Sequence, residues 1–313
     1  MSWLRPLLNR YLRLTEKRLL RRAEPEKMRR SLLRNARLFF HAPLFTSRST
    51  IPFGLSDAVV MTPRVETSDR VLLFFHGGGF VFGAPETHAA MLAALAKRAD
   101  AKAVLPRYPL APEHPFPAAI DHAIAAYRGC LADHSPANIV IGGDSAGGAL
   151  ALSVLAVAIK DGMPLPAGVF AFSPLTDLSF SGDSFRGNAV ADVVLPAERA
   201  EELTGMYLRD VAPTDPRVSP LFADFQGAPP VWITVGDTEI LLDDSLRMVE
   251  RLRAQGVDVT LVRENDLPHV WPLFHNILPE ARRTLDQVAT WIKAQTGASD
   301  CLLYTSPSPR DRG

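Results

Sequence analysis

The sequence has very little cysteine and no excess of either charge. Only Cys130 and Cys301 occur among its 313 residues, too few for a disulfide framework or a zinc-binding spacing. We therefore take a cytoplasmic location as the default. Basic and acidic residues number 34 each, so the overall charge gives no reason to expect a nucleic-acid partner. The chain also begins without an uninterrupted apolar run, so we expect no secretory signal and no stable membrane insertion.

Although basic and acidic residues are equal in number over the whole chain, the N-terminal segment is basic. Residues 1–40 contain twelve Arg or Lys and three Glu. A basic arm that binds membrane or nucleic acid is one interpretation; an amphipathic helix with solvated charges is the other, and we favour it. Apolar residues recur among the charges at helical spacing, and these are Leu4, Leu7, Leu8, Tyr11, Leu12, Leu14, Leu19 and Leu20. The segment is therefore predicted to pack on the rest of the molecule.

Short runs rich in Val, Ile and Phe alternate with helical segments along most of the chain. The expected strands are Ala58–Met61, Val71–Phe75, Ala103–Leu105, Ile139–Ile141, Val169–Phe172, Val231–Val235 and Val257–Val262. The expected helices are 87–99, 117–132, 146–160, 243–255 and 280–295. This alternation predicts an α/β fold with a mostly parallel central sheet and helices on both faces.

The remaining segments complete the expected domain organisation. Residues 1–45 are predicted to form two helices broken near Ala23–Pro25, and Pro43–Gly54 a loop. Residues 177–228 break the alternation, with one helix at about 196–208. We therefore expect an N-terminal helical segment over 1–50 and a catalytic domain over 51–296. The end of the chain, 297–313, is expected to be a disordered or artefactual tail, because residues 301–313 resemble a translated sequencing adapter.

Gly143-Asp144-Ser145-Ala146-Gly147 stands between an expected strand and an expected helix. That context favours a sharp turn that exposes the serine hydroxyl, with glycine at both flanks because larger side chains would collide there. The sequence therefore predicts Ser145 as a nucleophile. The alternative is a glycine-rich turn without chemistry.

His76-Gly77-Gly78-Gly79-Phe80 directly follows the expected strand Val71–Phe75. Bare backbone amides can approach a substrate oxygen, so Gly77, Gly78 and Gly79, with the amide of Ala146, are predicted to bind an oxyanion. A phosphate-binding loop is the alternative, but it would normally add a Lys-Ser/Thr pair before a helix.

A serine nucleophile needs a base, and the base needs an orienting acid. Only His269 and His275 follow Ser145, and His269 is favoured because it lies in a loop after an expected strand. For the acid, Asp243 and Asp244 are explained as the first turn of a helix. Asp237 and Glu239 remain as candidates for the orienting acid.

These strings together resemble the bacterial hormone-sensitive-lipase family of esterases over about residues 60–295. A third string, Tyr108-Pro109-Leu110-Ala111-Pro112-Glu113-His114-Pro115, also resembles the family pattern. The resemblance implies an α/β-hydrolase fold and ester hydrolysis without metal or cofactor. It also implies an N-terminal helical cap over 1–50, to which we expect residues 177–228 to contribute. It also places the acid at Glu239, with Asp237 second and Asp243 third. Glutamate departs from the family's more frequent aspartate.

We therefore expect a serine carboxylesterase that acts on short- to medium-chain acyl esters through Ser145, His269 and Glu239. A homodimer through the sheet edge is an open alternative. The substrate pocket is predicted to be lined by Phe80, Phe82, Leu195, Tyr207 and Trp271. The rival functions are a peptidase or amidase and a non-catalytic receptor on the same fold. A dehalogenase is excluded, because it would need aspartate in place of Ser145.

Overall fold

The computed structural model describes residues 2–64 and 68–297, so the predicted tail lies outside it apart from Gly297. Eight strands form one sheet in the order β1-β2-β4-β3-β5-β6-β7-β8. From β4 to β8 all neighbours pair in parallel, while β2 pairs antiparallel with both β1 and β4. The strands are β1 (Thr46–Phe53), β2 (Ser56–Pro63), β3 (Val71–Phe75), β4 (Lys102–Pro106), β5 (Ile139–Asp144), β6 (Gly168–Phe172), β7 (Val231–Gly236) and β8 (Val259–Glu264).

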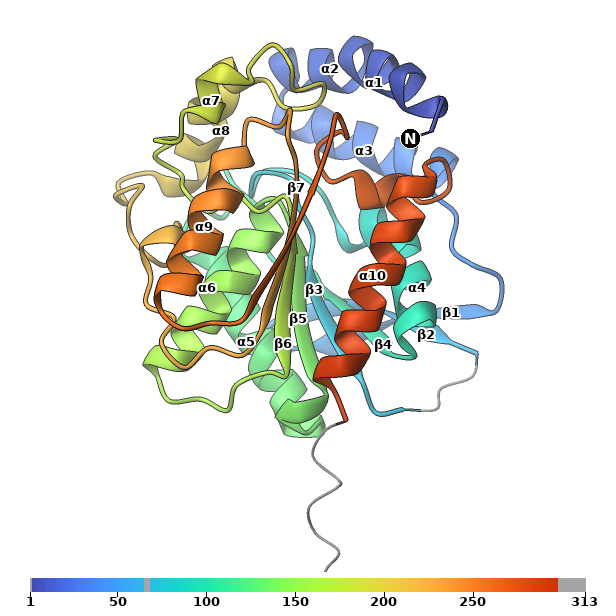
Figure 1. The fold of residues 1–313 in the computed structure, drawn as a ribbon, viewed down its shortest axis with the longest axis vertical. Coiled ribbons are helices and arrows are strands. Elements are labelled where there is room, and N and C mark those ends of the chain that lie inside the picture. The colour runs from blue at the N-terminus through green and yellow to red at the C-terminus, as the bar shows by residue number, and fades with distance from the viewer. Residues whose placement is uncertain (1, 65–67, 298–313) are drawn as a thin grey trace, which may run out of the picture.

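Helices cover both faces of this sheet (Figure 1), as the sequence predicts. The helices α4 and α10 pack on one face, and α5, α6 and α9 pack on the other. Their bounds are α4 (Pro85–Ala99), α5 (Ala118–Asp133), α6 (Ala146–Lys160), α9 (Leu242–Ala254) and α10 (Pro279–Gln295). Three short 3-10 helices complete this part of the chain: η1 (Pro136–Asn138), η2 (Pro220–Phe222) and η3 (Trp271–Phe274).

The central strands are mostly apolar, as expected of strands that are buried on both faces. In β3, for example, Val71, Leu73 and Phe75 belong to the core beneath α5 and α6. Leu72 and Phe74, which point the other way, belong to the core beneath α4 and α10.

The loop predicted for Pro43–Gly54 is wrong, because most of it forms strand β1. Among the described strands, β1 pairs with β2 alone, at the edge of the sheet, and six of its eight residues are exposed. An edge strand with both faces in water has no alternation of apolar residues, so the pattern that reveals other strands is missing here. The domain boundary expected at residue 50 falls inside this strand.

The N-terminal segment forms three helices rather than two: α1 (Leu4–Leu14), α2 (Glu16–Arg22) and α3 (Pro25–Phe39). The predicted break at Ala23–Pro25 is confirmed, since Ala23 is extended. The additional break is at Thr15, whose hydroxyl donates to the carbonyl of Tyr11 at 2.8 Å. A hydroxyl bonded back to the preceding turn competes with continued helix, which propensity alone does not reveal.

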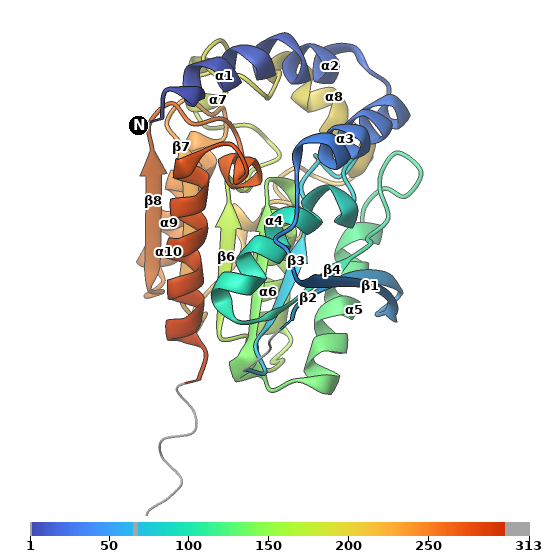
Figure 2. The same cartoon turned by 90° about the vertical axis from the view of Figure 1, so that its right-hand side faces the viewer.

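These three helices lie across the end of the molecule to which the parallel strands point (Figures 1 and 2). Helices α7 (Ser184–Gly187) and α8 (Ala197–Leu208) of the segment 177–228 lie beside them, and the later part of that segment, with η2, packs on α6 and α9. Buried Arg199 of α8 donates to the carbonyls of Leu20 and Ala23 at 3.0 and 2.6 Å, and so fixes α8 to α2. We call α1–α3 and the segment 177–228 the cap.

None of the helices within the described ranges combines the length and the apolar character that a bilayer crossing requires.

Candidate active site

Ser145 occupies a strained turn between β5 and α6. Its φ and ψ are +51° and −120°, a backbone conformation that residues with side chains rarely adopt. The turn is held because the Ser145 amide donates to the carbonyl of Phe172 at 2.9 Å. A Cβ on Gly143 would lie 2.1 Å from the carbonyl oxygen of Gly147, and one on Gly147 2.0 Å from that of Phe75. Both glycines are therefore required sterically.

The oxyanion loop lies beside this turn. Gly78 and Gly79 have φ of +124° and +57°, and neither amide donates a hydrogen bond within the described part of the chain. Gly77 differs from them, because its amide already donates to Oδ1 of Asp144 at 2.9 Å. Of the predicted amides, those of Gly78, Gly79 and Ala146 remain as donors, Ala146 because it opens helix α6.

His269 lies in the loop between β8 and η3 and pairs with Glu239. Its Nδ1 is 2.6 Å from Oε2 of Glu239, and both side chains are buried. The other carboxylate oxygen of Glu239 accepts from the Ser173 hydroxyl at 2.8 Å and the Gly236 amide at 2.6 Å. Burial lowers the pKa of His269, but the negative charge of Glu239 and its hydrogen bond outweigh this, so the pKa is raised.

The competing acids are engaged elsewhere. Asp237 accepts from the backbone amide of Asp266 at 2.7 Å. Asp243 accepts from the amide of Ser184, and Asp244 accepts from the amides of Thr176 and Asp177. The structure therefore pairs Glu239, and none of these three, with His269.

The alternative base, His275, lies just past η3. It is buried, and its ring nitrogens contact the carbonyls of Leu273 and His41. It is absent from the cavity above Ser145.

A buried network behind the oxyanion loop was not predicted from the sequence. Asp144 lies between the Gly77 amide and His88, whose Nε2 is 3.1 Å from Oδ1. His88 in turn contacts the Thr87 hydroxyl at 2.7 Å. The motif places Asp144 beside the nucleophile, but nothing in the sequence pairs it with His88, which precedes Ser145 by more than fifty positions.

His76 supports the same loop from the other side. Its ring stacks on Tyr108 with centroids 4.3 Å apart, and the Tyr108 hydroxyl donates to the His76 carbonyl at 2.6 Å. Burial, together with the neighbouring His88, lowers the pKa of His76 to about 3. The imidazole is therefore neutral and acts as a packing and hydrogen-bonding group.

Asp192, an acid that the sequence did not single out, links the cap to the His269–Glu239 pair. It is buried, and burial raises its pKa. One carboxylate oxygen accepts from the amides of Val194 and Leu195, and the other accepts from the amide of Ile240, next to Glu239. Asp192 thus fixes the position of the cap segment relative to the turn that carries Glu239.

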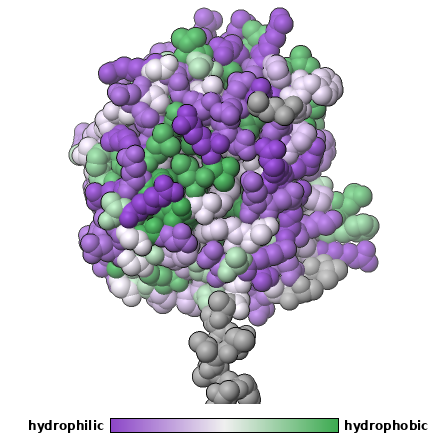
Figure 3. All heavy atoms as spheres, viewed as in Figure 1, coloured by the Kyte–Doolittle hydropathy of each residue, from purple (hydrophilic) through white to green (hydrophobic). Residues whose placement is uncertain are grey.

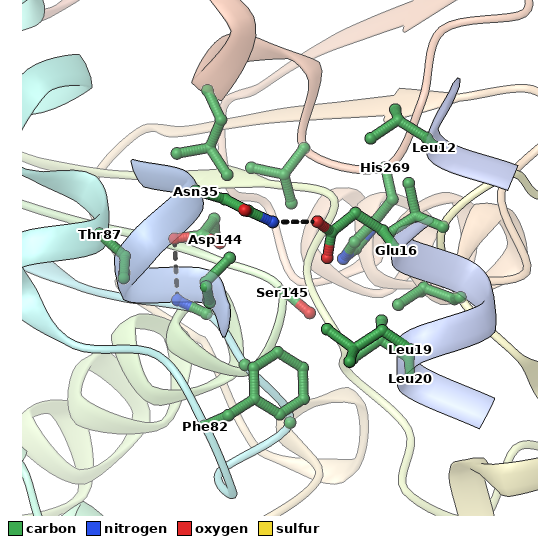
Figure 4. Close-up of a pocket in the computed structure, with 18 of the residues that line it drawn as sticks. Leu12, Glu16, Leu19, Leu20, Asn35, Phe82, Thr87, Asp144, Ser145 and His269 are labelled. Atoms are coloured by element: carbon green, nitrogen blue, oxygen red, sulfur yellow. Dashed lines mark hydrogen bonds between the residues drawn. The ribbon is translucent and has the colours of Figure 1, made fainter. Parts of the chain in front are cut away.

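Ser145 and His269 line one cavity of about 450 Å³ between the cap and the sheet, and Figure 4 shows both among the lining side chains. The walls are almost entirely apolar, and Leu19 and Leu20 of α2 face the serine. The polar pair in the cap wall is Glu16 with Asn35, joined at 2.6 Å.

Two of the five predicted pocket residues, Phe82 and Leu195, line this cavity. Phe80 and Tyr207 do not: their rings stack on each other 4.0 Å apart within the core. Trp271 is also fully buried, and its indole donates to Thr284 at 3.0 Å. Position in a loop near the motif does not decide whether an aromatic side chain faces the cavity or the core.

Comparison with known proteins agrees with this geometry. The family model described as the alpha/beta hydrolase fold matches residues 72–273. An esterase of Acinetobacter venetianus is 36% identical over 85% of this chain and 88% of its own length. The carboxylesterase/phospholipase LipF of Mycobacterium tuberculosis is 32% identical over 85% of this chain and 75% of its own.

A solved structure described as an esterase from the bacterial hormone-sensitive lipase family is also similar. It superimposes with a TM-score of 0.90 at 34% identity, covering 95% of this chain and 99% of that one. The chain therefore belongs to the α/β-hydrolase family, within its bacterial hormone-sensitive-lipase branch of carboxylesterases.

Proposed function

We propose that this carboxylesterase cleaves its substrates by acyl transfer through Ser145, His269 and Glu239. The Ser145 oxygen attacks the ester carbonyl carbon while its proton passes to His269. The tetrahedral intermediate then collapses, and the alcohol leaves with that proton. Water attacks the acyl-enzyme with the same histidine as base, which releases the acid and restores the serine.

The observation that carries this proposal is the alignment of groups on the cavity floor. Ser145 and His269 share one cavity, and the far nitrogen of His269 is 2.6 Å from a buried carboxylate. That carboxylate fixes the ring and stabilises the imidazolium that forms when the serine proton is taken. The amides of Gly78, Gly79 and Ala146, which have no acceptor within the described residues, would bind the oxyanion.

Replacement of Ser145 by Ala tests the proposal directly. We expect turnover of p-nitrophenyl butyrate to fall by about 10⁴-fold or more, because the nucleophile is lost while the fold is retained. Circular dichroism and thermal unfolding should match the parent protein. Activity close to the parent level in the folded variant would contradict the assignment.

For the substrate we propose esters with short- to medium-length acyl chains. The cavity has a volume of about 450 Å³ and nearly apolar walls, which suit an alkyl chain of limited length. Rates on p-nitrophenyl esters from C2 to C12 should peak below C10. Comparison of an ester with its matched anilide separates an esterase from an amidase.

A homodimer is a further proposal, and it would use the outer edge of β8. This strand ends the sheet and has one neighbour, β7, among the described strands. Two such edges can pair and cover each other's backbone groups. Sedimentation of the purified chain distinguishes a dimer from a monomer.

A further inference from the structure

The first cap helix carries a row of large apolar side chains on its outer surface. Trp3, Leu7, Tyr11 and Leu14 follow one another at intervals of four, four and three positions, which places them on one face of a helix. Trp3 is 76% exposed, and the other three are between 43% and 58% exposed. Leu8 and Leu12, on an adjacent face of the helix, are buried and hold it to the molecule. The outer row is therefore only partly covered by the rest of the fold.

This row extends to the mouth of the cavity above Ser145. Leu7 and Tyr11 are exposed and also line the cavity, so they form part of its rim. Across the entrance, Phe39 of α3 is exposed, lines the cavity and meets the ring of Tyr11 edge to face at 6.2 Å. Its neighbour Leu38 is 61% exposed. Exposed apolar residues of α1 and α3 thus form part of the rim of the cavity.

Positive charges flank the same surface. Arg10 lies within the row, and Arg18, Arg22 and Arg37 are exposed on the neighbouring turns of the cap. None of these four forms an ion pair or a hydrogen bond within residues 2–64 and 68–297. Figure 3 shows the resulting mixture of hydrophobic and hydrophilic residues at the top of the molecule, where Figure 1 places α1 and α2.

We propose that this face of the cap docks on the surface of an anionic lipid bilayer. An amphipathic helix with an apolar row and flanking arginines lies in the bilayer interface, with its apolar side chains among the lipid chains. Each arginine near an anionic surface adds to the attraction. The cavity mouth would then open toward the lipid, so that an ester dissolved in the bilayer enters without crossing water.

A second copy of the chain fits this surface less well than a lipid bilayer. Two such faces in contact would bring the unpaired arginines of both copies together, and like charges at an interface oppose association. The partner of this face must supply apolar area and negative charge together, which an anionic bilayer does.

Vesicle co-sedimentation of the full-length chain tests the docking. The probes are vesicles of phosphatidylglycerol mixed with phosphatidylcholine, and vesicles of phosphatidylcholine alone. The test variant is Leu14→Ser with Arg10→Glu; the control is Leu55→Ser with Arg128→Glu, which makes the same changes at exposed positions outside the cap. None of the four residues lines the cavity.

The parent and the control variant should bind the anionic vesicles, and binding should weaken with added salt. The cap variant should bind at least about tenfold more weakly, because it loses an apolar contact and reverses a charge. Trp3 fluorescence should shift to shorter wavelength on anionic vesicles and not on phosphatidylcholine alone. Hydrolysis of a water-soluble ester should be the same in all three proteins.

Several results would overturn the proposal. One is equal binding of the cap and control variants; another is no binding of the parent to anionic vesicles. A dimer that forms in solution and is lost only in the cap variant would assign the face to a second copy. Because vesicle binding and tryptophan fluorescence do not depend on Ser145, failure of the docking proposal leaves the proposed acyl transfer intact.

Discussion

The floor of the active-site cavity comes from loops that follow parallel strands, whereas its roof comes from helices of the cap. On the floor, a side chain at Gly143 or Gly147 would collide with a backbone oxygen, and Ser145 is proposed to be the nucleophile. In the roof, leucines such as Leu19 and Leu20 fill space, and other apolar residues of similar size would do the same. The chemistry is therefore built from positions that tolerate no change, and the shape of the pocket from positions that tolerate many.

Removal of the charge that orients His269 should give the largest effect of these comparisons. In Glu239→Gln, kcat/KM should fall by about 10³- to 10⁴-fold, as expected when a triad loses its acid. The raised pKa of His269 places the acid limb of the pH–rate profile above the ordinary value for histidine, since the ring must be neutral to act as base. In the variant that limb should move to lower pH.

Asp237→Asn is the matched control for Glu239→Gln. Asp237 contacts the Asp266 amide and not His269, so its variant should keep nearly full activity and an unchanged acid limb. If Asp237→Asn lost activity and Glu239→Gln kept it, Asp237 would be the acid that pairs with His269.

A glycine-to-alanine substitution should affect the free energy of unfolding differently on the floor of the cavity and in the cap. In Gly147→Ala the new Cβ would lie 2.0 Å from a backbone oxygen, so the turn between β5 and α6 must shift. We expect a loss of about 3 kcal/mol of unfolding free energy, as for other strained or overpacked positions, together with a loss of activity of about 10²-fold.

Gly205→Ala is the counterpart in the cap. Gly205 lies within α8, and an added Cβ meets nothing within 4 Å. Alanine in a helix interior is favoured over glycine by about 0.5–1 kcal/mol, so this variant should be more stable than the parent. Thermal unfolding of the two variants side by side decides whether the contrast holds.

The network behind the oxyanion loop should give a smaller effect. In Asp144→Ala the Gly77 amide loses its acceptor, and kcat should fall by about 10- to 100-fold with little change in KM. Asp144→Asn still offers an oxygen to that amide and should retain most of the activity. Similar losses in both variants would indicate that the charge of Asp144, rather than its hold on Gly77, matters.

A cap leucine should give the smallest effect. Leu19→Ala enlarges the cavity beside Ser145, so the preference should shift toward longer acyl chains by about two- to fivefold in relative kcat/KM. The acid limb of the pH profile should stay in place. A change in that limb would show that the cap also acts on the histidine.

Much of the fold follows from the sequence, because buried parallel strands are apolar on both faces and stand out as continuous runs. All seven predicted strands are present within three residues of their expected bounds. Strand β1 was not predicted, because most of its residues are exposed on both faces and it therefore has no apolar run. The break between α1 and α2 at Thr15 was not predicted either, because it is associated with a single side-chain hydrogen bond.

The sequence by itself determined the sharp turn at Ser145 and the glycine-rich loop at Gly77–Gly79, since backbone sterics allow few residues in those places and local motifs record them. It also predicted His269 as the base. The tertiary structure decided which acid meets the histidine, because Glu239 and Asp237 are two positions apart and only the direction of each side chain separates them. It also decided that Phe80, Tyr207 and Trp271 belong to the core. Contacts between segments far apart in the chain leave no local pattern, and these contacts determine the shape of the cavity.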